Sequence, residues 1–165
     1  MSDPRKQMQG RAAKAAGTYF ETRIDNSLVW YRAHQLAMVE KTPEPMHVLR
    51  RLSNGQFVCC FEKKAQPDYK GALKGGQSVA FEAKYTTGNR IAYTRVLDSQ
   101  ARWLDDYLAL GAYCFVVVGF SSGFVYRIPW TTWRDMKSLY GRKYILETEL
   151  AKFRVQEMNG ILRLI

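Results

Sequence analysis

The most constraining feature of the chain is an uninterrupted apolar run of eight residues, Tyr113 to Phe120. Most of its residues are β-branched or aromatic, a composition that favours a strand over a helix. A run without alternating polar residues is typical of a strand buried on both faces. This run is also far shorter than the roughly 20 residues that span a bilayer. Phe124 to Ile128 is predicted to pair with it across Ser121-Ser122-Gly123. The chain is therefore expected to form a sheet that is covered on both sides.

Helical and strand-like segments alternate along the rest of the chain. An Ala-rich segment from Gly10 to Glu40 predicts an amphipathic helix that is interrupted near Asn26-Ser27 and ended by Pro43 and Pro45. Further along, the pattern predicts helices over Leu97–Leu110 and Trp130–Leu139, strands over Met46–Arg51, Gln56–Phe61 and Ser78–Tyr85, and a loop or turn over Gln66–Gly76. The Asn54-Gly55 pair between the first two strands is a hairpin signal. This order predicts an α/β fold with a mixed central sheet flanked by helices.

The domain organisation is expected to be simple. No internal repeat and no long Gly/Ser/Pro-rich linker divides the sequence, so residues 10–165 are predicted to form a single domain. Residues 1–9 are expected to be a flexible basic arm. No secretory signal is found, which favours a soluble protein of the cytoplasm.

The charge balance indicates the kind of partner. The chain has 25 Lys and Arg residues against 15 Asp and Glu residues, a formal net charge of +10. A small domain with this excess is expected to bind a polyanion, and both nucleic acid and an anionic membrane qualify. The absence of a basic amphipathic helix argues against the membrane and against a protein whose basic surface binds acidic partners. The three cysteines have no C-x-x-C spacing and the two histidines lie apart, which excludes a zinc ribbon or finger.

One segment carries candidate chemistry: Asp68, then Glu82 and Lys84 on a predicted strand. Residues two apart share a face of a strand, so Ser78, Ala80, Glu82 and Lys84 are expected to face away from the apolar Val79, Phe81, Ala83 and Tyr85. The small residues of the first set are expected to leave that face open to approach. If Asp68 lies on the neighbouring strand, two carboxylates converge, and a cation such as Mg2+ relieves their repulsion. By spacing alone, a surface Glu82–Lys84 salt bridge with Asp68 at a turn remains the competing interpretation.

The surroundings of this segment resemble a known family. Pro67-Asp68 with Glu82 and Lys84 matches the pattern of the PD-(D/E)XK nuclease superfamily. More narrowly, the chain resembles the RecU family of Holliday-junction resolvases, which has an Asp-Tyr-Asn-Gly turn followed by Phe-Glu-Ala-Lys on the next strand. The corresponding segments here are Asp68-Tyr69-Lys70-Gly71 and Phe81-Glu82-Ala83-Lys84. Lys41-Thr42-Pro43 resembles the family's Lys-Pro-Thr-Pro segment, and the resemblance runs from about Arg11 to Ile128.

The resemblance implies a restriction-endonuclease-like sheet and a set of site residues. Asp68 and Glu82 would be metal ligands, with Gln100 completing the metal site from a helix, and Mg2+ the expected metal with Mn2+ as a substitute. Lys84 would stabilise the transition state. Glu21 resembles a glutamate that the superfamily often places near the site, although a solvated helix glutamate is an equal alternative.

Three positions depart from the family pattern. Gln66 stands where the family has a threonine two residues before the aspartate, Ser99 stands where it has a histidine, and Tyr85 stands where it often has an acidic residue. These departures are typical of a divergent member of the family, such as a phage-borne one. The expected location is the cytoplasm of a bacterial or phage-infected cell.

The predicted function is a homodimeric, metal-dependent endonuclease that cuts a four-way DNA junction by symmetric paired nicks. The candidate DNA-binding residues lie in polar stretches around the motif: Lys63, Lys64, Lys70, Lys74, Arg90 and Arg95. Two alternatives remain open: a nuclease for another DNA form, such as a flap or restriction target, and a non-catalytic basic DNA-binding module.

Overall fold

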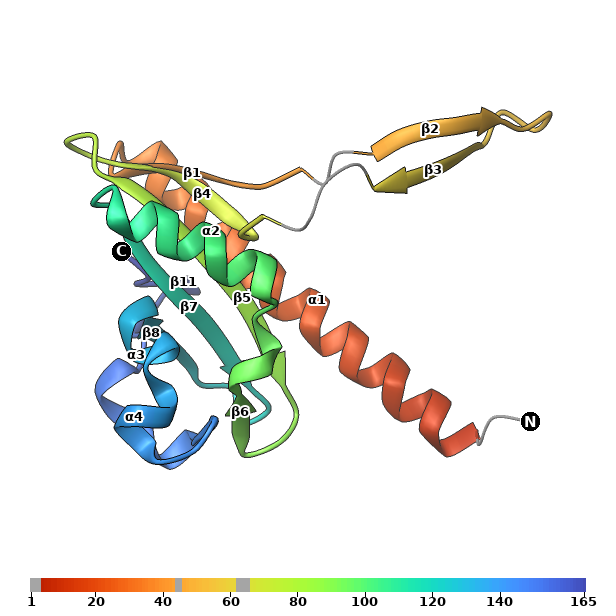
Figure 1. The fold of residues 1–165 in the computed structure, drawn as a ribbon. Helices are drawn as coiled ribbons and strands as arrows, with labels where there is room; N and C mark the ends of the chain where they lie inside the picture. The colour runs from red at the N-terminus through yellow and green to blue at the C-terminus, as the bar shows by residue number, and fades with distance from the viewer. Residues whose placement is uncertain (1–3, 44–45, 62–65) are drawn as a thin grey trace.

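The computed structural model describes residues 4–43, 46–61 and 66–165 (Figure 1). The helices are α1 (Pro4–Ala33), α2 (Asp98–Ala109), α3 (Trp130–Arg134) and α4 (Met136–Tyr140), with 3-10 turns at Tyr93–Arg95, Glu147–Glu149 and Ala151–Phe153. The strands are β1 (Ala37–Lys41), β2 (Met46–Arg51), β3 (Phe57–Phe61), β4 (Tyr69–Leu73), β5 (Ser78–Thr86), β6 (Arg90–Ala92), β7 (Tyr113–Phe120), β8 (Val125–Pro129), β9 (Tyr144–Leu146), β10 (Glu157–Met158) and β11 (Ile161–Leu162).

A five-stranded sheet with the order β1-β4-β5-β7-β8 forms the centre of the fold. The β5–β7 pair is parallel and the other three pairs are antiparallel, so the sheet is mixed. Helix α1 packs on one face, against β1 and β5, whereas α2 and α3 pack on the other, against β5 and β7 (Figure 1). The predicted fold class, a mixed central sheet flanked by helices, is confirmed.

Strand β7 divides the hydrophobic core into two layers. Phe115 and Val117 belong to the cluster under α1, while Val116 and Val118 belong to the cluster under α2, and all four are fully buried. Successive side chains of a strand point to opposite faces, so an apolar residue at every position is what a strand between two helical layers requires. The prediction made from the apolar run is confirmed, as is its pairing with β8.

Helix α1 differs from its prediction in both extent and continuity. It runs unbroken from Pro4 to Ala33, so residues 4–9 of the expected arm are helical, and residues 1–3 lie outside the described residues. The predicted interruption at Ser27 is wrong, because its buried hydroxyl donates to the Arg23 carbonyl and accepts from the Leu162 N–H. The N-terminal half of α1 projects beyond the sheet (Figure 1). Among the described residues, no helix is long and apolar enough to cross a membrane.

The helix prediction also missed strand β1. The helix ends at Ala33, and Gln35 has a φ of 55°, which turns the chain out of the helical direction. Ala37 and Val39 then alternate with exposed residues and pack under α1. The segment up to Glu40 was therefore predicted wrongly as helix, because a short strand with small apolar residues has no strong pattern of its own.

The loop or turn predicted over Gln66–Gly76 is wrong over its central part, which is strand β4. Gly71 lies in the middle of this strand, opposite Val39 of β1. A Cβ atom at Gly71 would lie 2.0 Å from the backbone oxygen of Met38. The glycine is therefore required by the close approach of β1 and not by a turn.

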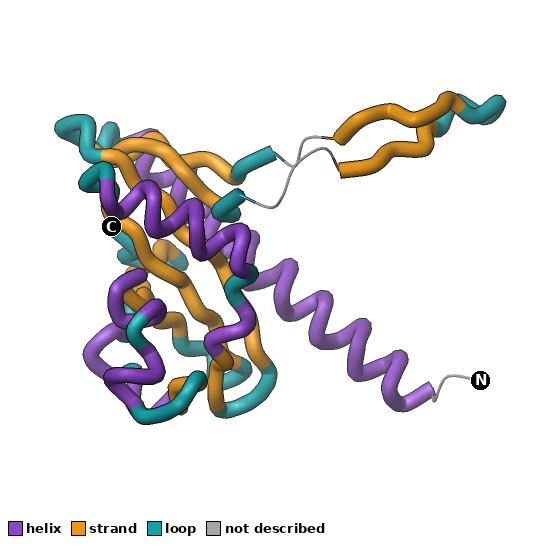
Figure 2. The backbone as a smooth tube through the Cα atoms, viewed as in Figure 1, coloured by secondary structure: helices purple, strands orange, loops and turns teal. Residues whose placement is uncertain are grey.

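Strands β2 and β3 form the predicted hairpin, closed through Gly55, which has a φ of 80°. They make a two-stranded sheet of their own and take no part in the central sheet. Every residue of β2 is exposed, and Figure 2 shows the hairpin extending away from the rest of the fold. The two strands therefore contribute little to the core.

Candidate active site

The candidate site lies where β4 begins beside the middle of β5. The first residue of β4, Tyr69, pairs with Phe81, so β5 continues past the start of its neighbour. At this position Asp68 Oδ2 accepts a hydrogen bond of 3.0 Å from the N–H of Ala83. The N–H of Asp68 in turn donates to Glu82 Oε1 at 3.2 Å. These two hydrogen bonds from backbone N–H groups to carboxylates extend the β4–β5 pairing and hold the two carboxylates side by side.

Lys84 completes the group. Its Nζ lies 2.7 Å from Glu82 Oε2 and 3.6 Å from Asp68 Oδ2. Glu82 and Lys84 are two residues apart on β5 and therefore share a face of the sheet. The side chain of Glu82 is fully buried, that of Lys84 is 15% exposed, and that of Asp68 is 32% exposed. The charged group thus runs from the protein interior to a surface that a substrate can reach.

The burial of Glu82 makes its negative charge costly. Burial raises the pKa of Glu82 to about 8, the positive charge of Lys84 lowers it, and the nearby Asp68 raises it further. One ammonium group therefore does not offset both the desolvation and the second carboxylate. A further cation at the two carboxylates would stabilise the ionised form of Glu82.

The expectation that the Glu82 face of β5 is open to approach is wrong for its central residues. Ala80 and Glu82 are both fully buried, because α2 and its neighbours cover this face. Access comes instead from the edge of β5 beyond the start of β4. A cleft of about 460 Å³ lies there, lined by Ala13, Gly17, Glu21, Asp68, Ala83, Lys84, Tyr85, Thr86, Thr87 and Arg95.

Glu21 enters this cleft from α1. It forms an ion pair of 2.5 Å with Lys41 at the end of β1, and the hydrogen bond to Glu21 raises the pKa of Lys41. One turn further along α1, Asp25 accepts a 2.8 Å hydrogen bond from the Tyr69 hydroxyl. Burial and this bond to Asp25 raise the pKa of Tyr69, which keeps the hydroxyl protonated as the donor. These contacts attach α1 to the strands that carry Asp68.

Gln100 makes no hydrogen bond with either carboxylate in the described part of the chain. It lies in the first turn of α2, which packs against β5, and its side chain is nearly fully buried. Its Oε1 accepts a 3.1 Å hydrogen bond from the N–H of Leu97 and so caps the helix. Gln100 is not among the described residues that line the cleft.

The predicted DNA-binding residues separate into two groups. Arg95 lines the cleft and donates to the Tyr85 carbonyl at 3.0 Å, and Lys70, two residues after Asp68, donates to Gln66 Oε1 at 2.7 Å. Lys74 follows the other end of β4, and Arg90 packs 4.9 Å from the centroid of the Tyr144 ring. Among the described residues, the cleft lining includes Arg95 but not Lys70, Lys74 or Arg90. Lys63 and Lys64 lie outside the described residues.

Sequence reasoning assigned no role to two residues that the structure places at the site. Lys41 pairs with Glu21, and the N–H of the adjacent Thr42 donates to the Asp68 carbonyl at 2.8 Å. The Thr42 hydroxyl is buried and has no hydrogen-bond partner among the described residues. The sequence signal for both residues is the Lys41-Thr42-Pro43 segment, which resembles the family's Lys-Pro-Thr-Pro segment.

Two carboxylates are a sufficient protein contribution for Mg2+, which retains several waters and is commonly held by one or two carboxylates together with a substrate phosphate. The part of the chain that the structure describes has no group of three His, Cys, Asp or Glu side chains able to hold a metal. The hard oxygen donors of Asp68 and Glu82, with a lysine ammonium already at hydrogen-bonding distance, fit Mg2+ better than zinc.

The sequence comparisons with known proteins find one family. Holliday junction resolvases RecU are similar to this chain: that of Limosilactobacillus reuteri is 26% identical over 146 residues, covering 82% of this chain and 71% of the relative. That of Listeria innocua is 27% identical over 156 residues, covering 88% and 77%. A solved structure of the Archaeoglobus fulgidus resolvase Hjc matches with a TM-score of 0.44 and 14% identity, covering 71% of this chain and 75% of that one. The family model described as Recombination protein U matches residues 15–164. Since this match spans nearly the whole chain, the chain belongs to the RecU family.

Proposed function

We propose that this chain is a metal-dependent endodeoxyribonuclease that resolves Holliday junctions by a pair of symmetric nicks. The observation that carries the proposal is the position of the Lys84 ammonium against the carboxylates of Glu82 and Asp68, at 2.7 and 3.6 Å. This arrangement lies at the rim of an accessible cleft. Membership of the RecU family supports the substrate, a four-way DNA junction, and a place of action in the cytoplasm of a bacterial or phage-infected cell.

Asp68 and Glu82 would hold the metal, which we expect to be Mg2+ with Mn2+ as a substitute. When bound, the ion would offset charge on the phosphate oxygens and lower the pKa of a bound water. The fit rests on the buried carboxylate of Glu82, whose ionised form needs more positive charge than Lys84 provides. Gln100 would contribute from α2 if its amide turned from the Leu97 N–H to the carboxylates.

Lys84 would act on the reacting phosphate itself. Its ammonium lies at the boundary between the buried Glu82 and the cleft, so it faces a phosphodiester placed there. A fixed positive charge at this point stabilises the additional negative charge that the phosphorus centre develops when water attacks. Glu21, held by Lys41, would position a water or the metal from the α1 side.

DNA would be recognised through its backbone and its branched shape. The net charge of +10 provides attraction without sequence selectivity. Arg95 in the cleft and Lys70 beside Asp68 are the cations placed to contact phosphates next to the scissile one. Lys74 and Arg90 would contact more distant parts of the same substrate.

Paired nicks require two active sites related by a twofold axis, so we expect a homodimer. Light scattering of the purified chain at micromolar concentration tests this directly. A mass of twice the 19.1 kDa of one chain supports the dimer, and a monomer that nicks only one strand of the junction contradicts it.

The test of the function uses a labelled four-way junction and a linear duplex of matching sequence, each with Mg2+, with Mn2+ and with chelator. Asp68→Asn and Lys84→Met are expected to lower junction cleavage at least about 100-fold while leaving junction binding intact. Glu40→Gln is the matched control, because this exposed carboxylate of β1 pairs with Arg32 away from the cleft.

Each other outcome selects an alternative. Preferential cutting of flaps or of the linear duplex would indicate a nuclease for another DNA form. Tight junction binding with no cleavage under either metal would indicate a non-catalytic DNA-binding module.

A further inference from the structure

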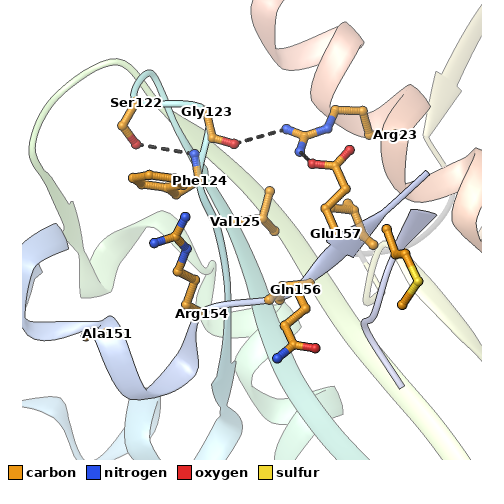
Figure 3. A pocket seen from close by; sticks show the side chains of 12 residues that line it. Arg23, Ser122, Gly123, Phe124, Val125, Ala151, Arg154, Gln156 and Glu157 are labelled. Carbon is orange, nitrogen blue, oxygen red and sulfur yellow. Dashed lines mark hydrogen bonds and ion pairs between the residues drawn. The ribbon is translucent and has the colours of Figure 1, made fainter. Parts of the chain in front are cut away.

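One hollow of the described structure lies away from the candidate active site. It has a volume of about 790 Å³ and lies between the β7–β8 turn, α1 and the C-terminal segment. Figure 3 shows Arg23 of α1 reaching Gly123 and Glu157, and Arg154 lying against the Phe124 ring. The ion pair of 2.8 Å with Glu157 neutralises Arg23. Arg154 has no such carboxylate partner among the described residues.

A second, smaller hollow of about 110 Å³ adjoins the first, with Arg154 and Val155 lining both. Four cationic residues line it, and among the described residues none of its lining side chains is acidic: Arg127, Lys152, Arg154 and Arg163. They come from β8, from the 3-10 turn at 151–153 and the residue after it, and from the residue after β11. We name these four residues the basic pocket. Segments far apart in the sequence thus bring positive charge to one place.

In the described part of the chain, no carboxylate forms an ion pair with the cations of the basic pocket. Arg127 donates to the Leu164 carbonyl at 2.7 Å and lies over the Tyr113 ring, and Lys152 lies over the Phe153 ring. Arg154 Cζ lies 3.6 Å from the centroid of the Phe124 ring. A carbonyl or an aromatic face orients a cation but does not neutralise it. Within the described part of the chain, no ion pair involves any of the four.

The β7–β8 turn lies between the cleft of the candidate active site and the larger hollow. The N–H and the hydroxyl of Ser121 donate to the carbonyls of Thr86 and Thr87, which line the cleft. Ser122 and Gly123, the next residues of the same turn, line the larger hollow. One turn therefore borders both the cleft and the larger hollow, and the larger hollow shares Arg154 with the basic pocket.

We propose that the basic pocket binds a backbone phosphate of the DNA arm that leads away from the cleavage site. The inference rests on the proposed function, since it takes its ligand from the DNA substrate. Four like charges without a counter-charge repel each other, and a phosphodiester, whose single negative charge is shared by two oxygens, reduces that repulsion. The pocket would fix the direction of the arm relative to the cleft without reading its sequence.

The test measures binding of a labelled four-way junction over a series of salt concentrations, in chelator so that no cleavage occurs. The double variant Lys152→Gln/Arg163→Gln removes two exposed cations of the pocket. The matched control, Arg102→Gln/Lys137→Gln, removes two exposed cations of α2 and α4 and so lowers the net charge equally. Cleavage at saturating protein is measured separately, so that failure of the proposed function is seen apart from failure of the pocket.

The pocket variant is expected to raise the Kd for the junction about tenfold and to reduce the slope of log K against log salt by about 1 to 2, with a much smaller change in the control. Equal Kd values and salt slopes for the two double variants would overturn the inference. A titration with inorganic phosphate separates the sources of the anion. If phosphate at millimolar concentration stabilises only the protein with an intact pocket, and DNA binding is the same in both variants, the pocket takes a free anion and the assignment to DNA is wrong.

Discussion

The buried carboxylate of Glu82 predicts an unusual dependence of stability on pH in the metal-free protein. Burial raises the pKa of Glu82 from 4.5 to about 8, and the opposing effect of Lys84 does not cancel this. The folded state therefore holds this proton more tightly than the unfolded chain does. The stabilisation of the folded state by the protonated Glu82 carboxyl is fully present below pH 4.5, falls as the pH rises, and is lost above pH 8. Glu82→Gln removes the titration but keeps the shape of the neutral form.

The magnitude follows from the two pKa values. For each pH unit between the two values, the contribution of Glu82 to the free energy of unfolding changes by about 1.4 kcal/mol. Across the whole interval the change is at most about 5 kcal/mol. The wild type and Glu82→Gln are expected to differ least in free energy of unfolding near pH 4.5. The variant should gain roughly 3 to 5 kcal/mol relative to the wild type by pH 9. Mg2+ should narrow this gap, because it favours the ionised carboxylate of the wild type.

Urea unfolding in chelator at pH 5, 7 and 9 measures this difference, followed by the same series with Mg2+. Glu40→Gln is the control, since its side chain is 61% exposed and its neutralisation should give a difference that hardly changes with pH. Parallel stability curves for the wild type and Glu82→Gln between pH 5 and 9 would refute the reasoning.

The remaining predictions concern the packing of the sheet. Gly71→Ala should destabilise the protein by more than about 3 kcal/mol in urea unfolding, because its Cβ would meet the Met38 backbone at 2.0 Å and relief of this clash requires the paired strands β1 and β4 to shift. Gly119→Ala should cost less, about 1 to 3 kcal/mol, because its Cβ meets the Phe20 ring at 2.6 Å and a side chain gives way more readily than backbone; equal losses at the two positions would contradict this. Replacing residues 46–61 by a short Gly-Ser linker should leave the thermal midpoint within a few degrees, because β2–β3 forms its own sheet and β2 is wholly exposed; a loss of cooperative unfolding would contradict this.

The features that could be predicted from the sequence are those carried by neighbouring residues. The apolar run of β7, the hairpin at Asn54-Gly55 and the helix α2 each have a period or a turn signal within one short segment. Glu82 and Lys84 are of the same kind, because their spacing of two places them on one face of a strand wherever the strand lies. The sequence made Asp68 their partner only if it lay on a neighbouring strand, the family resemblance favoured this, and the structure places Asp68 beside them.

The features that were missed depend on contacts between distant segments. Strand β4 contains a glycine that is typical of turns, and only pairing with β1 makes that glycine necessary. The predicted break at Asn26-Ser27 is absent because Leu162, far along the chain, uses the Ser27 hydroxyl. The Glu21–Lys41 ion pair likewise joins α1 to the end of a strand that the pattern did not reveal.

The sequence by itself therefore determined the α/β class, the basic character and the residue types of the candidate site, since hydrophobic period, composition and short motifs are local properties. Only the tertiary structure decided that Glu82 is fully buried, that the cleft opens at the edge of β5, and that four unpaired cations gather at the basic pocket. The physical reason is that burial and electrostatic environment depend on which segments pack together. That choice is made by the free energy of the whole fold and not by any one stretch of chain.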